Sequence, residues 1–96
     1  GGLTLRHIES YNLVSATGST LAAAARLGMS QSSVSRMLAQ LETYLGIRLF
    51  ERDKNRLVPT REGLHLGPRI RAIADQLEAV RHSAAELRTG NSQDVL

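Results

Sequence analysis

The sequence predicts a mainly α-helical protein in which three short helices and a small β-hairpin precede one long helix. Three observations predict it: serine or threonine caps before apolar stretches with helical spacing, turn formers between two β-type stretches, and a heptad pattern after them. The 96 residues fall below the roughly 100 to 150 of an average domain. We therefore expect one small domain with an appendage.

The first two helices are short and closely spaced. Thr4 is the expected cap of the first helix, which ends at Gly18. The second helix, Leu21 to Leu27, follows a cap at Ser19 or Thr20 and is mostly alanine, a strong helix former with little side-chain bulk. A neighbouring helix is therefore expected to pack close against it.

The third helix is expected to span Gln31 to Leu45, with Ser30 as its cap and Gly46 as its stop. Its apolar residues recur at spacings of four, three and four, which places them on one face. The residues expected to be buried on that face are Val34, Leu38, Leu41 and Leu45. The opposite face of the helix is polar.

Two short β-type stretches, Leu49 to Arg52 and Arg56 to Pro59, flank turn formers at positions 53–55 and predict a hairpin. Its basic residues are Arg52, Lys54 and Arg56. Glu51 and Asp53 reduce the net charge of positions 51–56 to +1 (3 − 2). The charge therefore leaves two interpretations: a hairpin that contacts a polyanion, or an ordinary surface hairpin.

The last helix is expected to begin after the cap Thr60 and to run to about Thr89. Its apolar positions alternate between spacings of four and three, which is the heptad pattern of a coiled coil. These positions are Leu66, Ile70, Ile73, Leu77, Val80, Ala84 and Leu87. We expect this seam to be left uncovered by its own domain and to form a dimer; packing against that domain is the alternative. Pro68 predicts either a bend or a fresh start of the helix.

Net charge separates the two parts of the chain. Positions 1–60 carry seven basic and four acidic residues (7 − 4 = +3), whereas positions 61–96 carry five of each (5 − 5 = 0). A positive field confined to the first part is typical of a polyanion-binding domain joined to a neutral appendage. We therefore expect a domain over 3–60, a dimerisation helix over 61–89 and a hinge or disordered tail over 90–96.

Positions 20–39 predict a helix-turn-helix unit. Ala23 and Ala24 keep the first of its helices thin, and Gly28 permits the sharp turn into the second. The start of the second helix then projects outward without an acidic residue before Glu42, so the positive end of its dipole is available to a polyanion. Amide, hydroxyl and guanidinium groups suit base edges and phosphates in the major groove. The expected DNA contacts are Ser30, Gln31, Ser32, Ser33, Ser35, Arg36 and Gln40, joined by the hairpin residues Arg52, Lys54 and Arg56.

These residues resemble a known family. The matching motifs are Leu13 to Ser19, Ser30-Gln31, Val34-Ser35-Arg36, Gln40-Leu41-Glu42, Leu45 to Arg52 and Pro59 to Gly63. Together they resemble the amino-terminal DNA-binding domain of LysR-type transcriptional regulators. The resemblance implies a winged helix-turn-helix, with the hairpin as the wing, followed by a linker helix that pairs antiparallel with a second copy. It also implies that Gln31, Ser32, Ser35 and Arg36 lie where family members touch DNA.

The chain departs from the family pattern at two places. After the capping Ser19 the family usually has a large apolar residue and then a hydroxyl residue, whereas this chain has Thr20 and then Leu21. A hydroxyl contact to phosphate from position 21 is therefore absent. Ser32 stands where proline is common, a harmless change in a first helical turn that adds a donor.

Two functions follow from this reading. The first is a sequence-specific regulator that binds double-stranded DNA as a homodimer on an interrupted inverted repeat; the alternative is a helical protein-interaction module without DNA binding. An enzyme is not expected, because cysteine is absent, the three histidines lie far apart in sequence, and no motif for a nucleophile or phosphate-binding loop is present.

The remaining expectations concern partners and context. No cofactor, metal or membrane is expected, and the location is expected to be the cytoplasm, at the nucleoid. We also expect the chain to be a truncated form of a longer protein, in which a carboxy-terminal domain would bind a small-molecule effector. The oligomeric state of that full-length protein could be a dimer or a tetramer.

Overall fold

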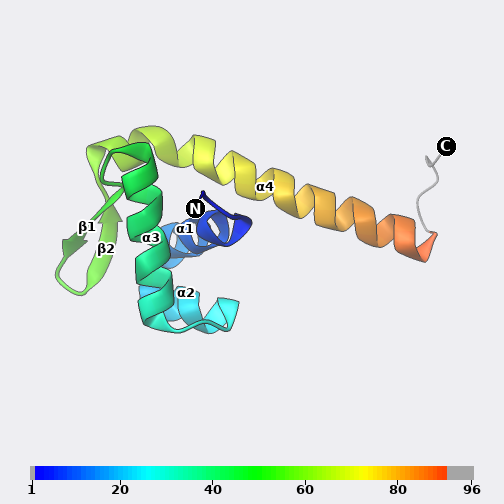
Figure 1. The fold of residues 1–96 in the computed structure, drawn as a ribbon, viewed down its shortest axis with the longest axis horizontal. Helices are drawn as coiled ribbons and strands as arrows, with labels where there is room; N and C mark the ends of the chain where they lie inside the picture. The colour runs from blue at the N-terminus through cyan, green and yellow to red at the C-terminus, as the bar shows by residue number, and fades with distance from the viewer. Residues whose placement is uncertain (1, 91–96) are drawn as a thin grey trace.

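A computed structural model describes residues 2–90 and has the predicted winged helix-turn-helix architecture with a long final helix (Figure 1). Its elements in chain order are α1 (Leu5–Thr17), α2 (Thr20–Leu27), α3 (Gln31–Leu45), β1 (Phe50–Asp53), β2 (Arg56–Pro59) and α4 (Arg61–Thr89). The predicted hinge or tail over 90–96 lies outside the described residues, apart from Gly90 at the end of α4.

The helix boundaries follow from local capping. The side chains of Ser19, Ser30 and Thr60 each accept a hydrogen bond from the backbone N–H three residues later, at the starts of α2, α3 and α4. Ser19 rather than Thr20 is therefore the cap of α2. At the other end of α2, Gly28 has a φ of 66°, in the left-handed region that a glycine adopts without steric cost, and this turn leads directly into α3.

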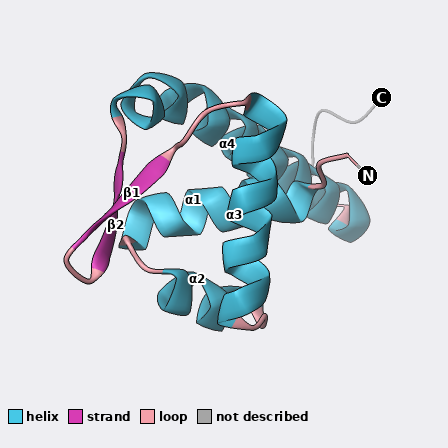
Figure 2. Cartoon of the chain, turned by 60° about the vertical axis from the view of Figure 1, so that its left-hand side comes forward, coloured by secondary structure: helices cyan, strands magenta, loops and turns pink. Residues whose placement is uncertain are grey.

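The core surrounds α1, which lies among the other three helices (Figures 1 and 2). Val14 of α1, Ala23 of α2 and Val34 of α3 are completely buried, and the rings of Tyr11 and Phe50 pack with their centroids 5.4 Å apart. Burial of this apolar surface supplies most of the stabilisation of the fold.

The predicted buried face of α3 is confirmed except at its last residue. Val34, Leu38 and Leu41 are buried, but Leu45 is 37% exposed, so the expectation for Leu45 is wrong. The reason is that α3 ends at Leu45, beyond the elements that cover its earlier turns. The next core side chain is Leu49, which is completely buried after the chain has turned.

The wing is an antiparallel pair of strands tied to the helices at both ends. Its register runs from Phe50 opposite Pro59 to Asp53 opposite Arg56. The strand β1 begins one residue later than the predicted Leu49. The Leu57 backbone N–H, in β2, donates to the Gly18 carbonyl at 2.9 Å, which fastens the wing to the turn between α1 and α2.

The first turns of α4 pack closely against the rest of the domain. A Cβ atom on Gly63 would overlap the carbonyl oxygen of Leu49, and one on Gly67 would lie 2.8 Å from the Tyr11 hydroxyl. Gly63 therefore permits a backbone approach that alanine would prevent, and Gly67 leaves room for the Tyr11 side chain. The helix continues unbroken through Pro68, so it does not restart there.

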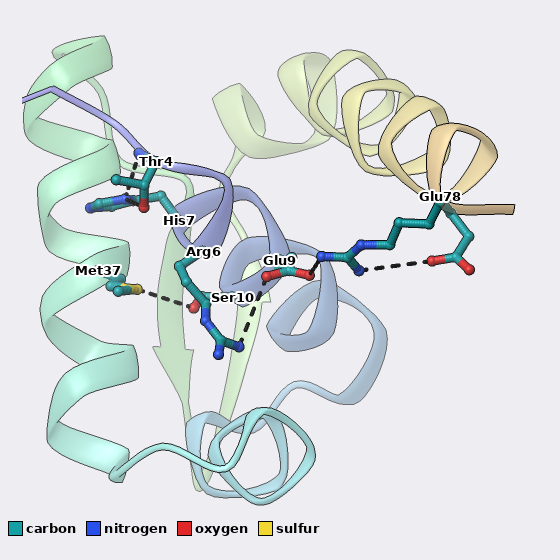
Figure 3. Close-up of polar contacts among 8 residues, drawn as sticks. Thr4, Arg6, His7, Glu9, Ser10, Met37 and Glu78 are labelled. Atoms are coloured by element: carbon teal, nitrogen blue, oxygen red, sulfur yellow. Dashed lines mark hydrogen bonds and ion pairs between the residues drawn. The ribbon is translucent and has the colours of Figure 1, made fainter. Parts of the chain in front are cut away.

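The far half of α4 projects away from the domain, which extends the molecule to 50 by 26 by 26 Å (Figure 1). Within this half of the helix, Arg81 still forms an ion pair of 2.8 Å with Glu9 of α1, and Glu9 also faces Arg6 (Figure 3). This ion pair joins α1 to α4 at 72 residues' separation.

The heptad seam of α4 is divided between two environments. Ile70 is only 7% exposed and belongs to the core, and Leu66 packs against the same cluster. The expectation that the whole seam is left uncovered is therefore wrong at its amino-terminal end, where the chain's own domain covers it. Ile73, Val80 and Leu87 remain 50%, 64% and 55% exposed.

Candidate nucleic-acid interface

The close crossing of α2 and α3 pushes the start of α3 to the surface. Ala23 and Ala24 are buried where the two helices meet, and Val34 and Leu38 hold the underside of α3 against the core. The residues left exposed along α3 and at its cap are Ser30, Gln31, Ser32, Ser35, Arg36 and Gln40. Six of the seven residues predicted for this surface are thus accessible in the structure, and Ser33 is half-buried.

The serines at the start of α3 divide into two groups. The Ser30 hydroxyl accepts the Ser33 backbone N–H at 3.1 Å and donates to the Ser33 hydroxyl at 2.8 Å, so both residues are engaged in capping the helix. Ser32 lies 3.2 Å from the Ser30 hydroxyl and is exposed, and Ser35 is exposed one turn further along. Ser32 and Ser35 are therefore better placed than Ser30 and Ser33 to meet a ligand.

Each of the two glutamines on this face is held by a side chain from another helix. The Gln31 amide Nε2 donates to the Thr20 hydroxyl oxygen of α2 at 2.9 Å. The Gln40 amide oxygen accepts from the His7 Nε2–H of α1 at 2.7 Å. On its other side, His7 Nδ1 accepts from the Thr4 backbone N–H at 3.0 Å (Figure 3). His7 and Thr20 are both buried. Both glutamine side chains are thus oriented before any ligand arrives.

Sequence reasoning missed these two supporting residues. Nothing in the neighbourhood of His7 along the chain points to a partner 33 positions away. For Thr20 the order of residues 20 and 21 gave a signal, since it reverses the usual pattern of the resembling family. That signal alone did not identify Gln31 as the partner.

Glu42 fixes the wing relative to α3. Its Oε2 atom accepts from the backbone N–H groups of Leu49 at 2.6 Å and Phe50 at 3.2 Å. The first carboxylate of α3 is therefore occupied by backbone donors at the root of the wing, and it also lies 4.0 Å from the Arg48 guanidinium. Glu42 is a third residue whose positioning role was missed, because its partners lie beyond the turn at Gly46.

The wing residues predicted to contact DNA are all exposed, but they differ in position. Arg52 lines the groove between α3 and the wing together with Ser35 and Arg48. Lys54 stands at the tip, with a φ of 58° in the left-handed region that few side-chain-bearing residues adopt. The Arg56 guanidinium lies against Gly18, beside the turn that precedes α2. The cation that sequence reasoning missed is Arg48, which is 77% exposed in this groove.

The arrangement presents cations and polar groups around the amino-terminal half of α3. No acidic residue lies in its first turn, and the unpaired backbone N–H groups of that turn favour an anion. Arg36 on the helix and the arginines of the wing groove extend this positive surface. Such a surface suits the phosphates of a polyanion, with polar side chains between them to meet its bases.

Residues 2–90 contain neither a metal-ligand cluster nor a membrane-spanning helix. In this part of the chain no three His, Asp or Glu side chains gather as metal ligands. No helix of the same residues has the length and apolarity needed to cross a bilayer.

Known proteins resemble the chain over most of its length. It is 40% identical over 86 residues to the HTH-type transcriptional regulator DgcR of Pseudoalteromonas sp and 41% identical over 86 residues to the transcriptional activator protein LysR of Escherichia coli K12. These alignments cover 90% of this chain but only 30% and 28% of the relatives. The chain thus spans about a third or less of the curated relatives it matches.

Solved structures resemble it in fold. The BenM DNA-binding domain in complex with catB site 1 DNA has a TM-score of 0.79 at 25% identity, covering 97% of this chain and all of that one. The CbnR DNA-binding domain in complex with DNA has a TM-score of 0.72 at 29% identity, covering 94% of this chain and all of that one. Residues 5–64 match the family model described as bacterial regulatory helix-turn-helix protein, lysR family. The chain therefore belongs to the lysR family of bacterial regulatory helix-turn-helix proteins.

Proposed function

We propose that this chain is the DNA-binding domain of a transcription regulator and that it reads double-stranded DNA with the amino-terminal half of α3. The observation that carries the proposal is the exposed, carboxylate-free start of α3, whose polar side chains are held outward by a packed helix crossing. Complexes of the BenM and CbnR DNA-binding domains with DNA support it.

Each side chain on this face would make the contact with DNA that its functional group allows. Gln31 supplies an amide that pairs with adenine, and Arg36 a guanidinium that pairs with guanine. Ser32 and Ser35 reach phosphates or base edges beside them. Gln40 lies further along the same exposed face.

The wing supplies a second set of contacts. Arg52 lies in the groove next to α3, and Lys54 and Arg56 extend the positive surface along the hairpin. These cations would neutralise phosphates or enter the minor groove, and each phosphate contact steepens the salt dependence of binding by about one unit.

The uncovered stripe of α4 supports a homodimer as the binding unit. Ile73, Val80 and Leu87 are spaced by seven residues and are exposed, as is expected where a second helix packs. A two-fold dimer presents two copies of α3, so its target would be an interrupted inverted repeat. Regulation by a small-molecule effector through a further domain, and a cytoplasmic location at the nucleoid, belong to the same proposal for the whole protein.

Selection of bound sequences from random duplex DNA tests the proposal. The chain is expected to enrich an interrupted inverted repeat, and its affinity for that duplex should fall steeply as salt is raised. No enrichment, together with binding that does not change with salt, would support the protein-interaction module instead.

Arg36→Ala tests the base contact. It is expected to weaken binding to the selected duplex by about 1 to 3 kcal/mol and to relax the preference at one position of each half-site. Arg88→Ala removes the same charge from the last turn of α4 and serves as the control. An equal loss for Arg36→Ala on selected and random duplexes would contradict a base contact.

A further inference from the structure

We propose that Thr20 is a specificity-determining positioning residue, which holds the Gln31 amide in the orientation that one base pair of each half-site requires. The inference rests on the proposed function, because it concerns how α3 reads DNA. Thr20 itself is 7% exposed and would not touch the duplex through its hydroxyl.

The contact joins the first turns of two packed helices. Thr20 is the first residue of α2 and Gln31 the first residue of α3, and the Gln31 Nε2 atom donates to the Thr20 Oγ1 atom over 2.9 Å. The Thr20 hydroxyl is not used to cap α2, since Ser19 accepts the Ala22 N–H there. A buried hydroxyl with a fixed backbone thus faces an exposed amide with a flexible stem.

The hydrogen bond to Thr20 uses only part of the hydrogen-bonding capacity of the Gln31 amide. The group has two N–H donors and one carbonyl acceptor. When one N–H is donated to Thr20, the other N–H and the carbonyl oxygen stay available, and these are the donor and acceptor that N7 and the N6 amino group of adenine require. A rotation of the amide away from Thr20 would lose this arrangement.

Holding the amide also lowers the cost of binding. A glutamine side chain has several rotatable bonds, and it loses conformational entropy when it is immobilised. If Thr20 restricts Gln31 in the free protein, less of this cost remains to be met on DNA. Thr20 is therefore expected to sharpen the preference for one base pair without changing the affinity for phosphates.

This role explains the departure at positions 20 and 21. The resembling family usually has a large apolar residue followed by a hydroxyl residue, whereas here the hydroxyl comes first and Leu21 is 65% exposed. In this chain the hydroxyl at position 20 is buried against the start of α3, whereas position 21 faces solvent. A hydroxyl at position 20 can therefore meet Gln31, which one at position 21 could not do from the solvent-exposed side.

Two substitutions of Thr20 separate its hydroxyl from its volume. Thr20→Val keeps the shape and removes the hydroxyl, and Thr20→Ser keeps the hydroxyl. The base pair read by Gln31 is identified first, as the position whose preference disappears when Gln31→Ala is passed through the same selection from random duplex DNA. Affinities are then measured on duplexes that carry each of the four base pairs at this position.

Thr20→Val is expected to lower the preference at that position by about three- to tenfold, the equivalent of one hydrogen bond. Preferences at other positions and affinity for random duplex should not change, and Thr20→Ser should retain the parental preference. An unchanged preference in Thr20→Val, or an equal loss on every duplex, would overturn the inference. Thr20→Ala gives the same comparison where valine perturbs the fold, which circular dichroism monitors.

A measurement without DNA separates this inference from the proposed function. The Gln31 side-chain amide in the free chain should be rigid by ¹⁵N relaxation in the parent and in Thr20→Ser, and mobile in Thr20→Val. Equal mobility in all three would overturn the positioning role, whatever the chain binds. If the amide is rigid but the chain enriches no sequence, the proposed function fails and the contact is structural.

Discussion

The two longest helices, α3 and α4, begin and end alike but differ in what covers them. Each starts at a side-chain cap and stops at a glycine in the left-handed region. On α3 the large apolar residues Val34, Leu38 and Leu41 are buried by the chain itself, and the amino-terminal part of the exposed face is polar. On α4 the buried residues end at Ile70, and the uncovered half keeps large apolar side chains at Ile73, Val80 and Leu87.

This difference shows what kind of partner each helix is suited to. The exposed first turns of α3 gain little from contact with an apolar surface, because they carry amides, hydroxyls and a guanidinium. The far half of α4 has apolar residues spaced by seven on one stripe. Exposure of this stripe to water is unfavourable, and packing against another helix would bury it. One helix therefore suits a polar ligand and the other suits a protein.

The largest expected effect is the loss of stability when an apolar side chain is shortened on the buried side of α3, compared with the same change at the uncovered end of α4. Leu41→Ala is expected to lower the free energy of unfolding by about 2 to 5 kcal/mol, because it leaves a cavity in a close-packed core. The same substitution at Leu87, measured by urea denaturation at a concentration where the chain is monomeric, should cost at most about 0.5 kcal/mol. Similar losses at both positions would mean that Leu87 is covered within its own chain.

A smaller effect is expected for self-association through α4. Val80→Glu places a carboxylate on the uncovered stripe, and its desolvation is expected to weaken the dimer at least about tenfold in sedimentation equilibrium. Val80 is preferable to Leu77 because Leu77 also lines the contact with α1. His82→Glu is the matched control, as His82 lies on another side of α4 and is 75% exposed. A dimer unaffected by Val80→Glu would show that the stripe is not the interface.

The smallest effect is expected for the ion pair that joins α1 to α4. Arg81→Ala removes the 2.8 Å contact with Glu9, but the guanidinium is about half exposed. Exposed pairs contribute roughly 0.2 to 1 kcal/mol. Thermal denaturation at low and high salt should show a loss within this range that shrinks as salt is added. A loss as large as that of Leu41→Ala would mean that the whole of α4 depends on this pair.

Much of the fold is predictable because its determinants are local. Ser30 caps α3 and Gly28 turns the chain before it, and both effects depend only on residues within a few positions. The positions of Leu45 and Ile70 were misjudged because a heptad or helical pattern says which face is apolar but not where the covering element stops. The pattern is the same on both sides of that boundary.

The site shows the same division between local and distant effects. Exposure of Gln31 and Arg36 follows from the pattern of α3 alone, and it was predicted. The partners that orient the site residues were not: Thr20 lies 11 positions from Gln31 and His7 lies 33 positions from Gln40. Such pairs depend on the angle at which helices cross, which no single stretch of sequence specifies.

The glycines at positions 63 and 67 have a consequence for how movement passes through the molecule. They bring the first turns of α4 against Leu49 and Tyr11 so closely that the helix has little room to pivot there. At 1.5 Å per residue, α4 is a rod about 44 Å long. Because the first turns of this helix pack against the domain that carries α3, we expect a tilt of its far end to reorient α3 with it.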